Sequence, residues 1–413
     1  MRRLRINFSA FFIGLFFSFV SFAQGINFIT GSFPSALEAA RRANKPLFVE
    51  VYLIGCPHCA ALAPVLEEKK VGDYFNQNFV NYKVEANSED SKMMQQQKGI
   101  TYVEFPLFFF FDPSSGQLIH QAAPGEHPTR AAMIDEVLKH GQDALSPATR
   151  TSSYPSRYAK GDRDLLFLVN YAKNAKATKD NDKLHQLNND IAKAFTKPAD
   201  LESATGFYVI SRLINDFSNP MAVYFFKNLE KYKAKFPAKE VKDAGELITY
   251  HTLYFGKRAN QLAYNEVVQI REAMIRLGIP KVESHRRTIL KELEALLRDK
   301  QTAQATNRLN EYVKIAKMTF QDYAYLVRYF NEKSTDNSYV PSLLKWVDSG
   351  LKMVTPKERS TKEVADFYSE QSKAYLKVGN KVEAKKAATN AVNAAKVAKV
   401  DIKPYNDSLA RIK

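Results

Sequence analysis

The chain has 413 residues, a formal net charge of +16, and a hydrophobic fraction of 45%. This length is enough for two or three domains, and the hydrophobic content excludes an intrinsically disordered chain. The charge is uneven: residues 24–145 carry 10 Lys and Arg against 14 Asp and Glu, whereas residues 146–413 carry 47 against 30. No basic motif interleaved with aromatic residues appears, so we expect Lys-rich solvated helices or a surface for an acidic partner, and no nucleic acid.

Residues 1–23 have the parts of a secretory signal peptide. Three arginines lie within the first five residues, residues 8–22 are apolar, and Ser21 and Ala23 are small residues before a cleavage point. The alternative is an uncleaved membrane anchor, although the apolar stretch is short for a membrane span. We therefore expect an exported protein of the bacterial cell envelope, periplasmic or secreted, with no transmembrane span after cleavage.

Strand and helix patterns alternate in residues 24–145, which indicates an α/β domain. Strands are expected at 26–29, 46–54, 78–84, 105–111 and 117–121. Helices are expected at 32–45, with Ser32 as the candidate N-cap, and at 60–70, 89–98 and 129–140. The only two cysteines of the sequence, Cys56 and Cys59, lie in Gly-Cys-Pro-His-Cys between a buried strand and a helix.

A cysteine pair at a strand-to-helix junction predicts redox chemistry. Free N–H groups and the dipole at a helix N-terminus favour a negative charge, and therefore the nucleophilic thiolate form of Cys56. Cys59, one turn later, can attack a mixed disulfide that Cys56 has formed, which predicts a redox-active Cys56–Cys59 disulfide. Half of a zinc site and a purely structural disulfide are the alternatives. The seven histidines are scattered without metal spacing, so we expect no metal.

The residues around this pair resemble those of the thioredoxin family over residues 25–145. Pro64 resembles the proline that kinks the active-site helix, Glu50 the buried carboxylate, and Pro106 the cis-proline that faces the disulfide. The resemblance implies a thioredoxin-like fold, disulfide exchange with protein substrates, and no cofactor. It also implies that the backbone of Phe105 is presented to an extended substrate.

Two further positions bear on this site. The neighbours of Glu50 are apolar on both faces of its strand, which favours burial over a solvent-facing position. A buried carboxyl group has a raised pKa and can carry the proton exchanged with Cys59. Gly55 departs from the family, in which an aromatic residue precedes the first cysteine, and this departure predicts a wider substrate-binding groove. Lys83 resembles the lysine near the family's carboxylate, with an exposed strand lysine as the alternative.

His58 bears on the direction of the reaction. The Pro-His dipeptide resembles that of DsbA-type periplasmic oxidases, and a histidine beside the thiolate stabilises the reduced form. Those proteins carry a helical insertion between the redox pair and the cis-proline, for which the 47 positions between Cys59 and Pro106 leave no room. Oxidase, reductase and isomerase therefore all remain open.

The rest of the chain is predicted to be helical. Residues 146–162 are rich in Ser, Thr and Pro and indicate a linker or an extended strap. Residues 163–413 are expected to form an all-α domain, in which Trp346 packs in the core. Residues 366–399 resemble a tetratricopeptide repeat at Tyr368, Ser372, Tyr375, Gly379, Ala384, Ala388 and Ala391. The predicted fold class is an α/β thioredoxin-like domain followed by an all-α, tetratricopeptide-like helical-repeat domain.

These observations lead to two hypotheses of function. The first is an exported thiol–disulfide oxidoreductase that exchanges disulfides with protein substrates and with an envelope redox partner, using its helical module to bind a protein partner. The alternative is a non-catalytic scaffold or adaptor protein that uses the thioredoxin fold and the helical repeats for protein–protein interaction.

Overall fold

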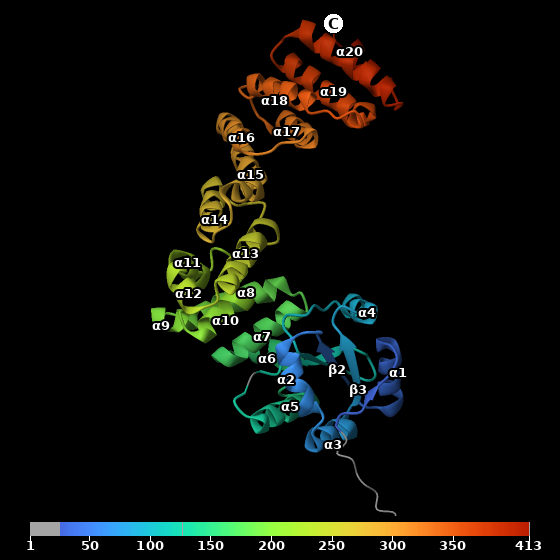
Figure 1. Ribbon diagram of the computed structural model, residues 1–413, viewed down its shortest axis with the longest axis vertical. Coiled ribbons are helices and arrows are strands. Elements are labelled where there is room, and N and C mark those ends of the chain that lie inside the picture. Colours follow the sequence, from blue (N-terminus) through green and yellow to red (C-terminus); the bar gives the residue numbers. More distant parts are fainter. Residues whose placement is uncertain (1–24, 126, 413) are drawn as a thin grey trace, which may run out of the picture. The chain divides into compact units, whose positions relative to one another are not determined.

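The computed structural model describes residues 25–125 and 127–412 (Figure 1). The signal peptide expected at residues 1–23 lies outside these residues. The chain divides into two compact units, one ending at Ile191 and the other beginning at Ala192. Within the described ranges, no helix is both long enough and apolar enough to cross a membrane.

The first unit is built on a five-stranded mixed sheet with the strand order β1–β3–β2–β4–β5. Its strands are β1 (Phe28–Ile29), β2 (Leu47–Tyr52), β3 (Val80–Glu85), β4 (Leu107–Phe111) and β5 (Leu118–Ala122). Strand β3 is parallel to β1 and β2, whereas β4 is antiparallel to both β2 and β5.

Helices cover both faces of this sheet (Figure 1). They are α1 (Phe33–Ala43), α2 (Pro57–Leu66), α3 (Lys69–Asn78), α4 (Glu89–Lys98) and α5 (Arg130–Leu145). Alternate residues of β4 serve the two cores: Phe108 and Phe110 pack with α2, α3 and α5, and Phe109 and Phe111 pack with α1. Because both faces of β4 are buried, an uninterrupted apolar strand is stable there.

Two of the elements expected from the sequence can be compared directly with the structure. The predicted N-cap of α1 is confirmed, since the Ser32 side chain accepts a hydrogen bond from the Ser35 N–H group. The single helix expected at residues 60–70 is wrong in its second half. Helix α2 ends at Leu66, and Glu68 is extended, with φ −66° and ψ 134°, as the N-cap of the next helix. Helix α3 was not predicted, because the sequence shows no break between it and α2.

The segment after α5 begins with a turn that packs on β5. It contains a 3₁₀ turn (Thr151–Ser153), α6 (Tyr154–Ala159), α7 (Leu165–Ala177) and α8 (Asn181–Ala194). The first two of these lie within the expected linker, so that segment is partly helical rather than extended. Thr151 donates its N–H group to Nδ1 of the buried His120 in β5 at 3.1 Å, and Tyr154 and Tyr158 are buried.

Within its described residues the second unit contains only helices. They are α9 (Pro198–Leu201), α10 (Ala204–Arg212), α11 (Pro220–Lys227), α12 (Leu229–Lys235), α13 (Ala238–Tyr254), α14 (Tyr264–Arg276), α15 (Lys281–Arg298), α16 (Thr302–Ile315), α17 (Phe320–Lys333), α18 (Val340–Lys352), α19 (Lys362–Lys377), α20 (Lys381–Val397) and α21 (Lys403–Ala410), with a 3₁₀ turn at Glu358–Ser360. Neighbouring helices pack as pairs, among them α14 with α15, α17 with α18, and α19 with α20.

The small residues of the expected repeat lie where α19 and α20 meet. Ala384, Ala388 and Ala391 are buried, and the Ser372 hydroxyl donates to the carbonyl group of Ala384 at 2.8 Å. Gly379 turns the chain between the two helices with φ +75°. Trp346 is buried in the core of this unit, as expected, and donates its indole N–H group to Asn310.

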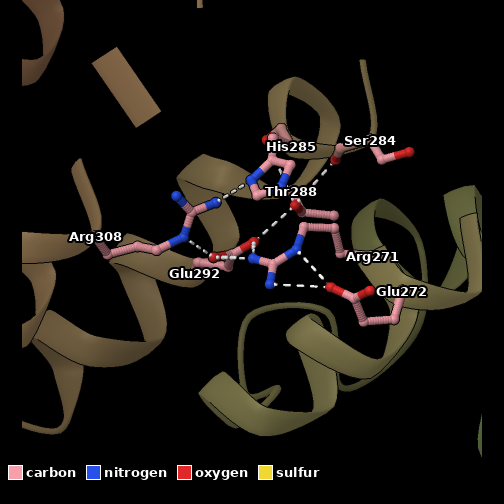
Figure 2. A network of polar contacts seen from close by, with 7 residues as sticks. All are labelled: Arg271, Glu272, Ser284, His285, Thr288, Glu292 and Arg308. Atoms are coloured by element: carbon pink, nitrogen blue, oxygen red, sulfur yellow. Dashed lines mark hydrogen bonds and ion pairs between the residues drawn. The ribbon is translucent and has the colours of Figure 1, made fainter. Parts of the chain in front are cut away.

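A buried polar network joins α14, α15 and α16 (Figure 2). Glu292 is fully buried; both its oxygens lie 2.7 Å from Nη1 of Arg271, and it also pairs with Arg308. The Thr288 hydroxyl donates to Glu292 at 2.8 Å. Nη2 of Arg308 lies 2.8 Å from Nδ1 of His285, and since a guanidinium group can only donate, this nitrogen must accept.

Candidate active site

The two thiols lie at the N-terminus of α2. Cys56 is the N-cap residue, with an extended backbone (φ −77°, ψ 120°), and Pro57 occupies the first helical position. A proline is favoured there because its missing N–H group would have no partner within the helix. Cys56 is half-buried and Cys59 is buried, and the structure holds both as free thiols. Of the two sulfur atoms, that of Cys56 is therefore the more accessible to a substrate.

The environment of Cys59 keeps its thiol protonated. The pKa of Cys59 is raised to about 11, mainly by burial, with smaller contributions from the neighbouring Cys56 and Glu50. The backbone N–H group of Leu53, 3.5 Å from the Cys59 sulfur, opposes this rise in pKa. Cys59 thus needs a base before it can act as a nucleophile.

Glu50 is buried next to a lysine on the adjacent strand. The parallel register of β2 and β3 sets Glu50 beside Lys83, and their charged atoms are 3.1 Å apart. Burial raises the pKa of Glu50, and the ion pair with Lys83 offsets only part of this effect. The expected burial of Glu50, with 1% of its surface exposed, is confirmed. Of the two alternatives for Lys83, the structure shows the one that the family resemblance implied, a lysine beside the carboxylate, with 33% of its side chain exposed.

One pocket connects these groups. It has a volume of about 350 Å³, and its lining includes Cys56, Cys59, Glu50 and Lys83. A carboxyl group and a buried thiol that share a pocket can exchange a proton through water.

The loop before β4 faces the thiols from the opposite side. The Phe105–Pro106 peptide bond is cis. The Cys56 sulfur lies 3.9 Å from the carbonyl oxygen of Phe105. The structure therefore brings together Cys56, Cys59 and Phe105, although these residues are 49 positions apart at the widest.

A glycine is favoured at position 55 by its backbone conformation, and not by a lack of room for a side chain. Its φ is +79°, a conformation that residues with a side chain rarely adopt, and a Cβ atom there would meet nothing within 4 Å. Ile54 and Tyr52 also line the pocket and were not among the predicted site residues. Ile54 is 75% exposed, and the Tyr52 ring lies 4.7 Å from the Lys83 ammonium group. Their signal in the sequence was adjacency to Gly55 and Cys56 in an apolar run.

His58 is exposed on the first turn of α2. Its expected influence on the redox direction stays a prediction. Within residues 25–125 and 127–412, no three His, Cys, Asp or Glu side chains are grouped closely enough to hold a metal ion.

The candidate site lies within a part of the chain that is similar to known proteins. The sequence model of a family described as thioredoxin-like matches residues 29–113. A solution structure of a candidate disulphide-isomerase from Bacteroides thetaiotaomicron is 28% identical to this chain, covering 30% of this chain and 95% of its own, with a TM-score of 0.25. No curated protein matches. The chain thus carries a thioredoxin-like domain, with Cys56 and Cys59 close together in it, followed by a long all-helical region.

Proposed function

We propose that the protein is an exported thiol–disulfide oxidoreductase that exchanges disulfides with protein substrates through Cys56 and Cys59. The observation that carries the proposal is the position of the accessible Cys56 sulfur, at a helix N-terminus and 3.9 Å from the Phe105 carbonyl oxygen. A helix N-terminus stabilises a thiolate, and the exposed backbone of a loop can hold an extended peptide beside it.

In the reducing direction, the Cys56 thiolate attacks one sulfur of a substrate disulfide. A bond forms between Cys56 and the substrate, and the other substrate sulfur leaves as a thiolate. Cys59 then attacks the Cys56 sulfur, the mixed disulfide breaks, and the second substrate thiolate leaves. The two cysteines lose two electrons, and the substrate gains them. The same steps in reverse oxidise a substrate.

Glu50 is the proposed proton carrier of the second step. The raised pKa of Cys59, about 11, means that its proton must be removed before it attacks. The raised pKa of Glu50 makes its carboxylate a better base than an exposed one, and both groups line the same pocket. His58 is proposed to favour the reduced form by stabilising the Cys56 thiolate.

The basic leader and apolar stretch of residues 1–23 support export to the periplasm or beyond, where disulfides persist. In such a compartment the pair needs an envelope redox partner to restore its starting state. The helical region is the proposed place for a protein partner, since packed helix pairs present an extended surface.

Trapping of mixed disulfides tests the proposal. In cells that export the protein, Cys59→Ser is expected to accumulate mixed disulfides through Cys56, because the resolving thiol is lost. Cys56→Ser is the matched control and should trap nothing. Non-reducing gel electrophoresis followed by mass spectrometry identifies the trapped proteins.

Two results would contradict the proposal. Trapping by Cys56→Ser instead of Cys59→Ser would reverse the two roles. Purified wild-type protein that neither reduces nor oxidises any disulfide would favour the adaptor hypothesis.

A further inference from the structure

The loop that carries Phe105 has no regular secondary structure to hold it. It connects the end of α4 at Lys98 with the start of β4 at Leu107, and residues 101–106 are neither helix nor strand. Its Phe105 carbonyl oxygen nevertheless lies 3.9 Å from the Cys56 sulfur. The distance between the thiol and this carbonyl therefore depends on contacts that hold the loop from outside.

One side of the loop is held by α4. The hydroxyl groups of Tyr102 and Ser91 are 2.5 Å apart. The Tyr102 ring packs edge-on against Phe105, with ring centres 5.8 Å apart. These contacts lie wholly within the thioredoxin-like domain.

The other side is held by α7, which follows the thioredoxin-like domain in the sequence. The Thr101 N–H group donates to the carbonyl oxygen of Ala177 at 2.7 Å. Ala177 is the last residue of α7, where carbonyl groups have no partner within the helix. Lys173, one turn earlier, lies 3.1 Å from Glu104, and only 22% and 21% of these side chains are exposed. Partial burial weakens solvent screening, so this ion pair holds the loop more firmly than a surface pair would.

Helix α7 is itself anchored to the sheet. The Thr151 N–H group and hydroxyl donate to His120 and to the Ile119 carbonyl group of β5, at 3.1 and 3.4 Å. Burial lowers the pKa of His120 to about 3, so its ring stays neutral and Nδ1 remains an acceptor. Tyr154, which follows this turn, packs against Phe167 and Tyr171 of α7 at ring-centre distances of 5.3 and 5.6 Å. The loop is therefore tied to a helix that is itself linked to the sheet through Tyr154 and Thr151.

We propose that Glu104 and Lys173 are positioning residues, through which α7 sets where the Phe105 backbone meets a peptide substrate beside Cys56. The proposal rests on the proposed disulfide exchange. It extends the catalytic unit beyond residue 113 to include α7, and it assigns two residues that touch neither sulfur atom.

The test compares full-length Glu104→Gln and Lys173→Met with the wild type. Each variant removes one charge and nearly keeps the side-chain length, so the fold should survive. One substrate is a peptide with a single disulfide bond, which needs the loop to hold its backbone. The other is iodoacetamide, which alkylates Cys56 without any backbone contact. Loss of the ion pair should raise KM for the peptide about three- to ten-fold, with kcat and the alkylation rate unchanged.

Two further variants sharpen the test. Glu246→Gln weakens the Arg287–Glu246 pair, which is also partly exposed (35% and 32%) and joins α15 to α13 in the second unit, so its KM should stay at the wild-type value. The charge-reversed double variant Glu104→Lys/Lys173→Glu should recover at least part of the lost affinity, since the attraction is restored.

An unchanged KM in both single variants would overturn the positioning role while leaving the exchange activity standing. So would an equal loss of peptide exchange and alkylation, because that pattern indicates general disruption of the site. Wild-type protein that exchanges no disulfide would overturn the proposed function and this inference together.

Discussion

At the scale of single residues, the burial of Glu50 explains how one site can both need and supply a base. The strand places a carboxyl group in the pocket that also holds Cys59, and Lys83 prevents the cost of its burial from becoming prohibitive. The two raised pKa values, of Glu50 and Cys59, have burial as their largest common cause.

Glu50→Gln should therefore slow disulfide exchange, by about 10- to 100-fold at neutral pH, because an amide cannot accept the Cys59 proton. The control is Glu85→Gln, which removes a carboxylate that binds Asn87 and does not line the pocket. Stopped-flow exchange with a peptide disulfide over a range of pH measures the effect. An unchanged rate and pH profile would exclude the proton-carrier role.

Glu50→Gln should slow exchange, but it should also make the protein less prone to lose stability as the pH rises. Because folding raises the pKa of Glu50, its contribution to stability is full below its ordinary value of 4.5 and is lost as pH rises through the folded-state value. A glutamine does not ionise, so the Glu50→Gln variant does not undergo this loss of stability at higher pH. Thermal unfolding should show the stability of the variant rising relative to that of the wild type between pH 4 and pH 8, and a relative fall over that range would contradict the burial argument.

At the scale of elements, the turn between β2 and α2 depends on Gly55. A substitution there meets no steric obstacle, so its cost comes from the positive φ alone. Gly278, between α14 and α15, has φ +91° and equally open surroundings, and it does not line the pocket.

We expect Gly55→Ala and Gly278→Ala each to lower the free energy of unfolding by about 1 kcal/mol, because both force a side chain into a left-handed conformation. Only Gly55→Ala should also slow disulfide exchange, since it tilts the start of α2. Chemical denaturation and exchange assays on both variants check this. Equal exchange rates would show that the turn tolerates the change without moving Cys56.

The helical region has its own critical element, the α14–α15–α16 network around Glu292. Burial by itself would raise the pKa of Glu292, but Arg308, Arg271 and Thr288 hold it below its usual range. Removing this carboxylate leaves two guanidinium groups with little access to water.

Glu292→Gln should destabilise the helical region by about 3 kcal/mol, the usual scale for breaking a buried ion pair from one side. Glu283→Gln, on the same helix but with partly exposed partners Arg286 and Arg287, should cost less than about 1 kcal/mol. Calorimetry of the full chain separates the two. Comparable losses would mean that the network is not a stability centre.

At the scale of the whole molecule, the contacts of α6 and α7 bear on where the catalytic unit ends. The sequence places a domain boundary at residue 145, and that boundary stays a prediction. The structure's first compact unit runs to Ile191, and α8 ends at Ala194.

A fragment of residues 24–197 should accordingly fold and exchange peptide disulfides as the full chain does. A fragment of residues 24–145 should be less stable by about 2 kcal/mol or more, because it exposes His120 and its neighbours on β5. It should also bind peptides more weakly without Lys173. Equal stability and KM for the two fragments would show that α6 and α7 are dispensable.

The sequence by itself determined the features that local patterns encode. Apolar runs of strand length predicted the sheet, the Ser32 cap predicted the start of α1, and the adjacency of strand, cysteines and helix predicted the candidate site. The burial of Glu50 also followed from its immediate neighbours, because a strand that is apolar on both faces leaves no solvent-facing position.

Only the tertiary structure decided which distant residues meet. The helical pattern of residues 60–70 runs on without interruption, so the sequence did not reveal the break at Glu68. The pairing of Thr101 with Ala177, of Glu104 with Lys173, and of Glu292 with two arginines arises from how whole helices pack. Such contacts join positions that no short period relates, so their geometry exists only once the elements that carry them have been assembled.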